Sequence, residues 1–258
     1  MKIGFFDSGL GGLLILKAVV KQLPQYDYVF YGDTAHLPYG DKTEGEIFTL
    51  TKTGVEYLFE QGCLLVIIAC NTASSETLRQ LQDTVLVGNY KTRRILGVII
   101  PTIEAVLESE VDKVMLFATK RTVASSKYDR EFRKFSRDLV MESKALPRLV
   151  PLIEGGKIAE ATLLLTMEIQ QAREQGLNNL ILGCTHYCLL KEGARKEVSG
   201  VGQVFAQDEI IPPKLAQYLV RHPEITSKLT RFSTVQVVLT EQREDYDLLV
   251  PVFSNGLG

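Results

Sequence analysis

Short runs of apolar residues alternate along the chain with longer stretches in which apolar positions recur with a helical period. Because the short runs are continuously apolar, they are typical of strands buried on both faces of a parallel sheet. Strands are predicted at 3–6, 28–31, 64–69, 95–98, 114–118 and 180–183, with weaker ones at 139–143, 203–206 and 235–239. Helices are predicted near 11–22, 44–61, 74–83, 101–109, 121–136, 157–175, 187–198 and 212–221. This alternation predicts a doubly wound α/β fold.

The chain has two halves with the same pattern of strands and polar residues. Asp7 follows the first strand of the first half, and Cys70 follows a later strand 63 residues on. In the second half, Thr119 follows the first strand, and Cys184 follows a later strand 65 residues on. We interpret this as a tandem duplication that gives two pseudo-symmetric α/β domains with the active site in the cleft between them. The first domain is predicted to comprise residues 1–95 and 211–258, and the second residues 96–210.

Composition narrows the class of protein. With 45% hydrophobic and 23% charged residues among 258, the chain has the composition of a globular protein. The net charge is −2 and no basic stripe occurs, so nucleic acid is not an expected partner. The longest apolar run, 63–69, is too short to span a membrane, and the N-terminal apolar run stops at Asp7, too early for a signal peptide. We therefore expect a cytoplasmic protein with no membrane partner.

Two of the four cysteines stand in equivalent places. Cys70 and Cys184 each follow an apolar strand, at the end of the sheet where ligands bind in open α/β folds. The helix expected after each cysteine should lower the pKa of its thiol. A single cysteine after a strand more often only fills space, but two in matching positions favour a functional interpretation. Cys63 and Cys188 lack this setting and are assigned to packing.

Two thiols on opposite sides of one ligand suit the inversion of a carbon stereocentre. A thiolate removes a proton from one face, and a thiol returns a proton to the other. His186 is placed to activate Cys184, and Asp7 to play the matching part for Cys70. No metal is expected, because Cys184-Thr185-His186 has no C-x-x-C or H-E-x-x-H partner.

Other polar stretches allow more than one interpretation. The turn after the first strand, Ser8–Gly12, lacks the G-x-G-x-x-G spacing and is predicted to receive a small carboxylate, with Ser8 as donor. Pro38 and Tyr39 either cover a ligand or belong to a plain surface loop. Thr119 and Thr122 cap a helix, bind a carboxylate, or do both.

Glu154 precedes a predicted helix. A carboxylate is favourable at a helix start for electrostatic reasons alone. It also suits binding of an ammonium group or orientation of His186, and the sequence leaves these three roles open.

Several stretches together resemble the motifs of bacterial glutamate racemases, in the same order and over nearly the whole chain. They are Phe6–Gly12, Gly32–Ala35, Leu37–Gly40, Ala69–Ser74, Val150–Glu154 and Leu182–Tyr187. The resemblance implies interconversion of L- and D-glutamate, which supplies D-glutamate for peptidoglycan and the cell wall. It also implies that the enzyme works without pyridoxal phosphate, metal or any other cofactor, and that it forms a homodimer.

The resemblance also implies roles for individual residues. Cys70 acts on D-glutamate and Cys184 on L-glutamate, with Asp7 and His186 assisting and Glu154 as a further active-site carboxylate. The substrate is held by Asp7, Ser8, Pro38, Tyr39, Gly40, Cys70, Asn71, Thr72, Thr119, Thr122, Cys184, Thr185 and His186.

The chain departs from the family pattern in a few places. His36 stands where the family usually has arginine, and Cys188 where it has proline. An Asp-Ser-Ala-like stretch is replaced by Gln207-Asp208-Glu209. Two alternatives to glutamate racemase stay open: a related racemase such as an aspartate racemase, and a non-catalytic protein whose main role is to bind a partner such as DNA gyrase. The intact motifs around both cysteines favour the first interpretation.

Overall fold

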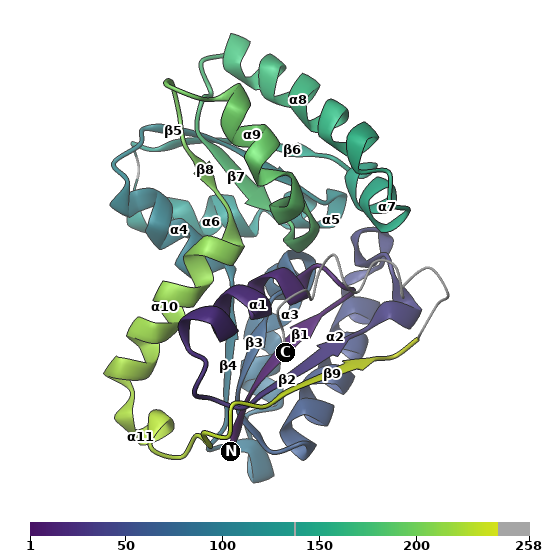
Figure 1. Cartoon of the computed structure of the whole chain (residues 1–258), viewed down its shortest axis with the longest axis vertical. Coiled ribbons are helices and arrows are strands. Elements are labelled where there is room, and N and C mark those ends of the chain that lie inside the picture. The colour runs from purple at the N-terminus through teal and green to yellow at the C-terminus, as the bar shows by residue number, and fades with distance from the viewer. Residues whose placement is uncertain (137, 242–258) are drawn as a thin grey trace.

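The structure is a computed structural model and describes residues 1–136 and 138–241. Its strands form two sheets, one in each of two lobes, and every strand pair in the described residues is parallel (Figure 1). The first sheet has the order β4-β3-β1-β2-β9 and the second the order β6-β5-β7-β8. The strands are β1 Lys2–Asp7, β2 Tyr28–Gly32, β3 Cys63–Ile68, β4 Arg94–Gly97, β5 Lys113–Ala118, β6 Val140–Ala145, β7 Leu180–Gly183, β8 Val204–Phe205 and β9 Val235–Leu239.

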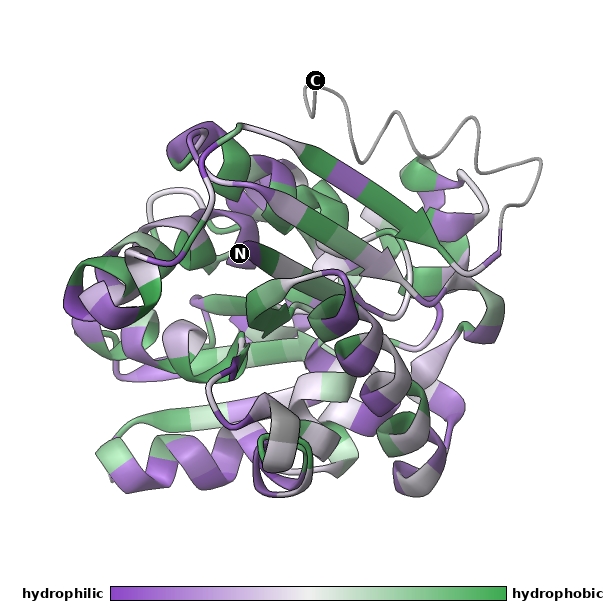
Figure 2. Ribbon diagram, turned by 90° about the horizontal axis from the view of Figure 1, so that it is seen from below, coloured by the Kyte–Doolittle hydropathy of each residue, from purple (hydrophilic) through white to green (hydrophobic). Residues whose placement is uncertain are grey.

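Helices connect the strands and cover both sheets. Residues of β3 are all buried, as expected for a strand covered on two faces, and Figure 2 shows apolar strands with more polar helices outside them. The helices are α1 Gly12–Gln22, α2 Glu44–Glu60, α3 Asn71–Thr84, α4 Ile99–Glu108, α5 Lys120–Ala124, α6 Lys127–Phe135, α7 Leu149–Glu154, α8 Ile158–Glu174, α9 Lys191–Glu197, α10 Gln207–Arg221 and α11 Pro223–Thr226. Short 3-10 helices are η1 Thr34–His36, η2 Tyr39–Asp41, η3 Gly88–Tyr90 and η4 Thr185–Leu190. None of the described helices is both long and apolar enough to cross a membrane.

The two sheets share one topology. The order β2-β1-β3-β4 in the first lobe matches β6-β5-β7-β8 in the second. In each, the direction of winding reverses between two central neighbours, β1 with β3 and β5 with β7. A crevice outside the carboxyl ends of such strands is the usual ligand site of this fold. The structure thus confirms the predicted α/β class with two related lobes. Each lobe has one such switch point in its strand order, at the carboxyl ends of its central strands.

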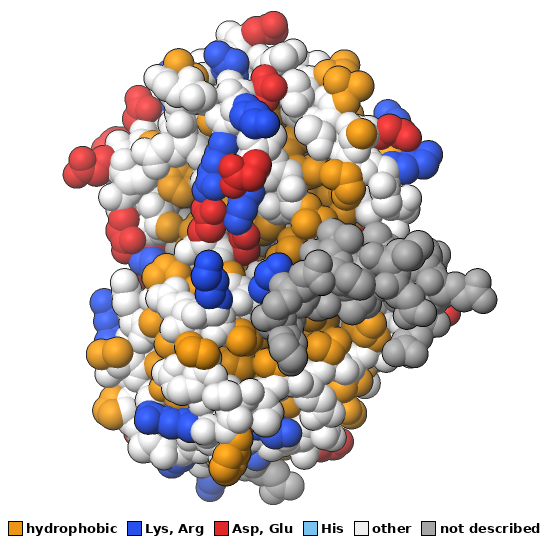
Figure 3. All heavy atoms as spheres, in the orientation of Figure 1, with side chains coloured by type: hydrophobic (Ala, Val, Ile, Leu, Met, Phe, Trp, Pro, Cys, Tyr) orange, Lys and Arg blue, Asp and Glu red, His pale blue; other side chains and the backbone are white. Residues whose placement is uncertain are grey.

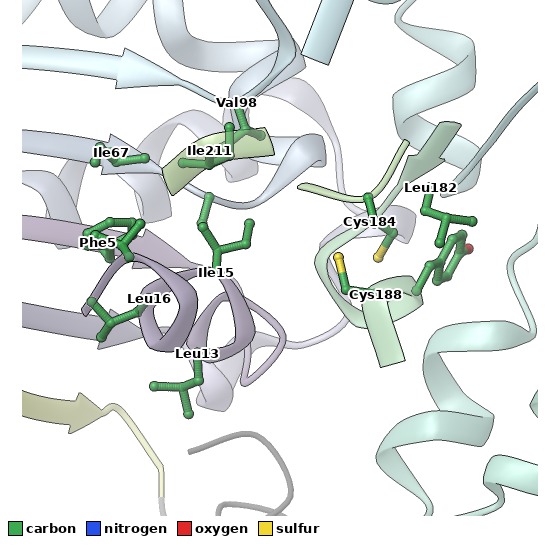
Figure 4. Packing of buried hydrophobic residues seen from close by; sticks show 14 of the residues in the cluster. Phe5, Leu13, Ile15, Leu16, Ile67, Val98, Leu182, Cys184, Cys188 and Ile211 are labelled. Atoms are coloured by element: carbon green, nitrogen blue, oxygen red, sulfur yellow. The ribbon is translucent and has the colours of Figure 1, made fainter. Parts of the chain in front are cut away.

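The C-terminal part of the described chain returns to the first lobe. Strand β9 pairs with β2, where Tyr28 lies opposite Val235. Helix α10 packs against α1, and one apolar cluster runs from β1 through both helices to β7 and η4. Figure 4 shows Ile15 of α1 and Ile211 of α10 within this cluster. The predicted boundary at residue 211 therefore falls inside α10, and residues 242–258 of that prediction lie outside the described part of the chain.

Some predicted elements differ from the observed ones. The single helix predicted at 121–136 is divided into α5 and α6, because Ser126 adopts a left-handed conformation with φ of 51°. The helix predicted at 187–198 is instead η4 followed by α9. Helix α10 begins at Gln207 rather than 212, so that Pro212 and Pro213 lie inside it. Proline is common in the first turn of a helix, so the prolines suggest a helix start at 212, which is five residues after the observed start.

Charges of both signs are interspersed on the surface. Figure 3 shows acidic and basic side chains gathered over α9, where Lys191 contacts Asp208 and Glu209, and Arg195 contacts Glu209. These ion pairs tie α9 of the second lobe to the first turn of α10.

Candidate active site

A small pocket lies between the two lobes, and both Cys70 and Cys184 line it. It encloses about 50 Å³ and is lined by residues from both carboxyl-end crevices. This volume is far below the roughly 300–1,000 Å³ of sites for larger ligands, so the pocket suits a small molecule. The lining residues are Ser8, Leu37, Pro38, Tyr39, Gly40, Asp41, Cys70, Asn71, Thr72, Thr119, Lys120, Leu146, Pro147, Val150, Pro151, Cys184, Thr185 and His186.

Most of the residues predicted from the sequence line this pocket, and three lie behind its wall. Asp7 is fully buried and contacts Thr185, Thr122 contacts Thr72 and Thr119, and Glu154 contacts His186. The sequence reasoning missed the remaining lining residues. They are Leu37, Asp41, Lys120, Leu146, Pro147, Val150 and Pro151.

Cys70 belongs to the first lobe and caps helix α3. Its Sγ accepts a hydrogen bond from the N–H of Ala73 at 3.5 Å and lies 3.2 Å from the Oγ of Ser8. The positive end of helix α3 does not determine the pKa of this thiol, however. Burial, followed by the negative charge of Asp7, raises the pKa of Cys70 to about 12. The prediction of a lowered pKa is wrong for this residue, and Cys70 is a neutral thiol near pH 7.

Asp7 occupies the start of helix α1. Its Oδ2 accepts hydrogen bonds from the N–H of Gly12 at 3.0 Å and of Gly9 at 3.3 Å. Two backbone N–H groups of the turn predicted to receive a ligand carboxylate therefore bind a carboxylate of the protein instead, while the role of Ser8 as a donor to a ligand stays a prediction. Burial raises the pKa of Asp7 to about 6, because it outweighs the effects of His186 and the two backbone donors.

The two lobes meet closely at this point. The hydroxyl of Thr185 lies 3.4 Å from Oδ1 of Asp7 and bonds it across the lobe boundary. Gly11 allows this approach, since a Cβ atom there would lie 2.4 Å from Oγ1 of Thr185 and 2.7 Å from Nδ1 of His186. A larger residue at position 11 would push the lobes apart.

The second cysteine stands beside a charged pair. Nδ1 of His186 lies 3.9 Å from Sγ of Cys184, and its Nε2 contacts Oε1 of Glu154. Burial alone would lower the pKa of His186, but Cys184 and Glu154 together raise it well above its ordinary value. This shift favours the protonated, positively charged form of the ring, which lies beside the sulfur of Cys184. Of the three roles left open for Glu154, the geometry favours orientation of His186.

Threonine hydroxyls form the polar wall of the pocket. Oγ1 of Thr72 in the first lobe lies 2.9 Å from that of Thr119 and 3.3 Å from that of Thr122 in the second. Thr119 also caps α5 by accepting from the N–H of Thr122 at 3.2 Å. The capping role is thus confirmed for Thr119, which also lines the pocket, while binding of a carboxylate by these threonines stays a prediction.

A loop of the first lobe closes the pocket from one side. The hydroxyl of Tyr39 donates to Oδ2 of Asp33 at 2.6 Å, while Oδ1 of Asp33 lies 2.7 Å from Nδ1 of His36. Position 40 touches the other lobe, since a Cβ on Gly40 would lie 3.4 Å from Cβ of Thr119. Pro38 and Tyr39 both line the pocket, so this loop is part of its wall, while covering of a ligand stays a prediction. Asp33, which holds Tyr39 in this loop, lies in the Gly32–Ala35 stretch of the resemblance, but the sequence alone indicates no role of its own for it.

Within the described residues, no group of three or more His, Cys, Asp or Glu side chains is arranged to hold a metal ion. The side chains that line the pocket or contact its lining residues include thiols, an imidazole ring, carboxylates and hydroxyl groups.

Comparison with known proteins agrees with this geometry. Residues 41–212 match the family described as Asp/Glu/Hydantoin racemase. The chain belongs to this family. It is 39% identical to a glutamate racemase of Ruegeria pomeroyi over 238 residues, which cover 87% of each chain. This confirms the resemblance drawn from the motifs.

Solved structures of this family share the fold. A glutamate racemase of Bacillus anthracis superposes with a TM-score of 0.87 at 25% identity, covering 98% of this chain and 94% of that one. A glutamate racemase of Francisella tularensis in complex with D-glutamate gives a TM-score of 0.84 at 27% identity, with 98% and 93% covered. The two-lobed α/β architecture is therefore that of the family.

Proposed function

We propose that this protein is a glutamate racemase in which Cys70 and Cys184 exchange protons with the α-carbon of the substrate. The observation that carries the proposal is that both thiols line one small pocket, each from the corresponding strand end of its own lobe. The names of the curated relatives, and D-glutamate in the Francisella tularensis structure, support glutamate as the substrate.

The groups around the two cysteines support an assignment of which one accepts a proton and which one donates a proton when L-glutamate is converted to D-glutamate. We assign the proton-accepting role toward L-glutamate to Cys184, because the raised pKa of His186 favours a positively charged ring beside it, and we assign the proton-donating role to the neutral thiol of Cys70. With L-glutamate, the Cα–H bond breaks as an S–H bond forms on Cys184. The S–H bond of Cys70 then breaks as a C–H bond forms on the opposite face, which gives D-glutamate. The reverse reaction exchanges the two roles.

The polar wall holds the substrate. We assign this role to the pocket residues Ser8, Pro38, Tyr39, Gly40, Asn71, Thr72, Thr119 and Thr185, while Thr122 acts through its contacts with Thr72 and Thr119. Hydroxyl and amide groups suit the carboxylates of glutamate. Asp7 and Glu154 act from behind the wall, on Cys70 and His186 respectively.

The wider assignment follows from the same family membership. We propose a cytoplasmic homodimer that needs no cofactor and supplies D-glutamate for peptidoglycan. We also propose that residues 1–95 and 211–258 form one domain and residues 96–210 the other, which is supported by the pairing of β9 with β2.

The proposed activity has a direct test. Incubated with either enantiomer of glutamate and no added cofactor, the protein should produce an equal mixture of both, as followed by polarimetry. In deuterated water the α-carbon should gain deuterium. Aspartate offered under the same conditions is the matched control. Faster turnover of aspartate would assign the other substrate, and no turnover of either would favour the non-catalytic binding protein.

Glu154→Gln should weaken catalysis through His186. The neutral amide still reaches the ring but no longer favours its positive charge, so the pKa of His186 falls. We expect kcat/KM to fall about tenfold, and its alkaline limb to move to lower pH by about one unit. Since the two enantiomers have equal free energies, kcat/KM must fall equally in both directions.

The control for this prediction is Glu160→Gln, which removes an exposed carboxylate in α8. It should leave the pH profile unchanged. An alkaline limb in Glu154→Gln that coincides with that of the unaltered enzyme would show that Glu154 does not act on the charge of His186.

A further inference from the structure

A buried network of amide and hydroxyl groups lies behind Asn71. Gln207, the first residue of α10, is fully buried. Its Nε2 donates to Oδ1 of Asn71 at 3.0 Å and to Oγ1 of Thr102 at 3.1 Å. Its Oε1 accepts from Nδ2 of Asn71 at 2.6 Å, and the hydroxyl of Tyr128 donates to Oδ1 of Asn71 at 2.7 Å. Helices α3, α4, α6 and α10 thus meet at one pair of amides.

The direction of every hydrogen bond in this network follows from one backbone group. The hydroxyl of Thr102 donates to the carbonyl oxygen of Val98 at 2.7 Å, and a carbonyl can only accept. The oxygen of Thr102 must therefore accept from Gln207, which turns the NH₂ side of the Gln207 amide toward Thr102. The Oε1 atom of Gln207 then faces Asn71, and only the Nδ2 atom of Asn71 can donate a hydrogen bond to it.

This orientation determines what Asn71 offers to a ligand. Its oxygen already accepts from Tyr128 and Gln207, which uses both lone pairs. One N–H donates to Gln207. The other N–H has no acceptor among the described residues, and Asn71 lines the pocket. A donor in this place recognises an anionic oxygen and not an ammonium group.

We propose that Gln207 is a positioning residue that keeps an N–H of Asn71 directed at a carboxylate group of the substrate. The inference rests on the proposed function, and it adds a residue that does not line the pocket. Gln207 lies in the stretch where the sequence departs from the family pattern.

The test is Gln207→Glu, assayed over a range of pH. A protonated glutamic acid still donates one hydrogen bond to the network, whereas the carboxylate donates none and repels Oδ1 of Asn71. The KM for glutamate should be close to that of the unaltered enzyme at about pH 6 and about tenfold higher at about pH 8.5, because burial raises the pKa of the new carboxyl into this range. The value of kcat should change less.

Gln170→Glu is the matched control, because it makes the same change on the exposed surface of α8. Its ratio of KM to that of the unaltered enzyme should be independent of pH. If Gln207→Glu unfolds at alkaline pH, Gln207→Met decides the matter, since it fills the same space without a donor. It should raise KM at every pH.

Three outcomes would overturn the inference. A ratio of KM that does not vary with pH in Gln207→Glu contradicts it, as does an unchanged KM in Gln207→Met. If the unaltered enzyme racemises glutamate, either result removes only the role of Gln207. If the unaltered enzyme does not racemise glutamate, the proposed function is wrong, and the ligand assigned to Asn71 is wrong with it.

Discussion

Cys70→Ala and Cys184→Ala should each reduce kcat for racemisation at least a thousandfold in both directions. A proton must leave one face of the α-carbon and another must reach the opposite face, so removal of either thiol stops the full reaction. General acid–base groups commonly contribute about 10²–10⁴ in rate, and each cysteine serves as acid in one direction and as base in the other. Polarimetry with each enantiomer measures the loss.

Exchange of the α-proton should survive in part, and it should distinguish the two variants. With Cys184 alone, L-glutamate can lose its proton and regain deuterium on the same face, so Cys70→Ala should label L-glutamate without inverting it. Cys184→Ala should label only D-glutamate, and more slowly, because burial and Asp7 hold the remaining Cys70 in its neutral form. Proton NMR in deuterated water measures both rates.

Cys63→Ala is the matched control, because Cys63 is a buried thiol at the opposite end of β3 and does not line the pocket. It should racemise glutamate at the unaltered rate. Labelling of both enantiomers by both single variants would show that the thiols do not divide the two faces between them.

The sequence predicts the parts of this site that depend on strand ends. Asp7, Cys70, Thr119 and Cys184 each follow an apolar run, and parallel strands place such positions at one edge of a sheet. The matching spacing in the two halves also predicts that the two sheet edges are equivalent. The strand orders of the two sheets agree with this prediction. The pattern of apolar runs, together with the fold class, is therefore enough to locate the site residues that follow the ends of strands.

Properties that depend on burial and on distant contacts could not be predicted in this way. The sequence places Cys70 before a helix, which favours a thiolate, but only the fold shows that burial and Asp7 outweigh that helix. The partners of Asp33 and Gln207 are likewise set by packing between separate elements. Asp33 lies in a stretch that resembles the family and Gln207 in one that departs from it, but neither stretch indicates the contacts that these side chains make.

Asp7→Asn should make the folded protein more stable above neutral pH. Burial raises the pKa of Asp7 from 3.8 to about 6, so the folded state binds its proton more tightly than the unfolded state does. A raised pKa contributes stability below pH 3.8, and that contribution is lost as the pH rises through about 6. Above this range the buried carboxylate costs about 3 kcal/mol, which a neutral asparagine avoids.

The same substitution should lower activity. An asparagine oxygen can still accept from Gly9 and Gly12, so the turn is kept. It cannot take up a proton, however, whereas a carboxyl with a pKa near 6 can relay one for Cys70 near neutrality. We expect kcat/KM to fall about a hundredfold, equally for both enantiomers.

Urea denaturation at several pH values measures the gain in stability. The free energy of unfolding of Asp7→Asn, relative to the unaltered protein, should increase by about 1–2 kcal/mol between about pH 5 and about pH 8. Asp41→Asn is a suitable control, since this carboxylate lies on the rim of the pocket and not behind it, and it should give a difference that is independent of pH. A difference for Asp7→Asn that is flat over the same range would mean that Asp7 is not a strained buried carboxylate, and the relay to Cys70 would lose its physical basis.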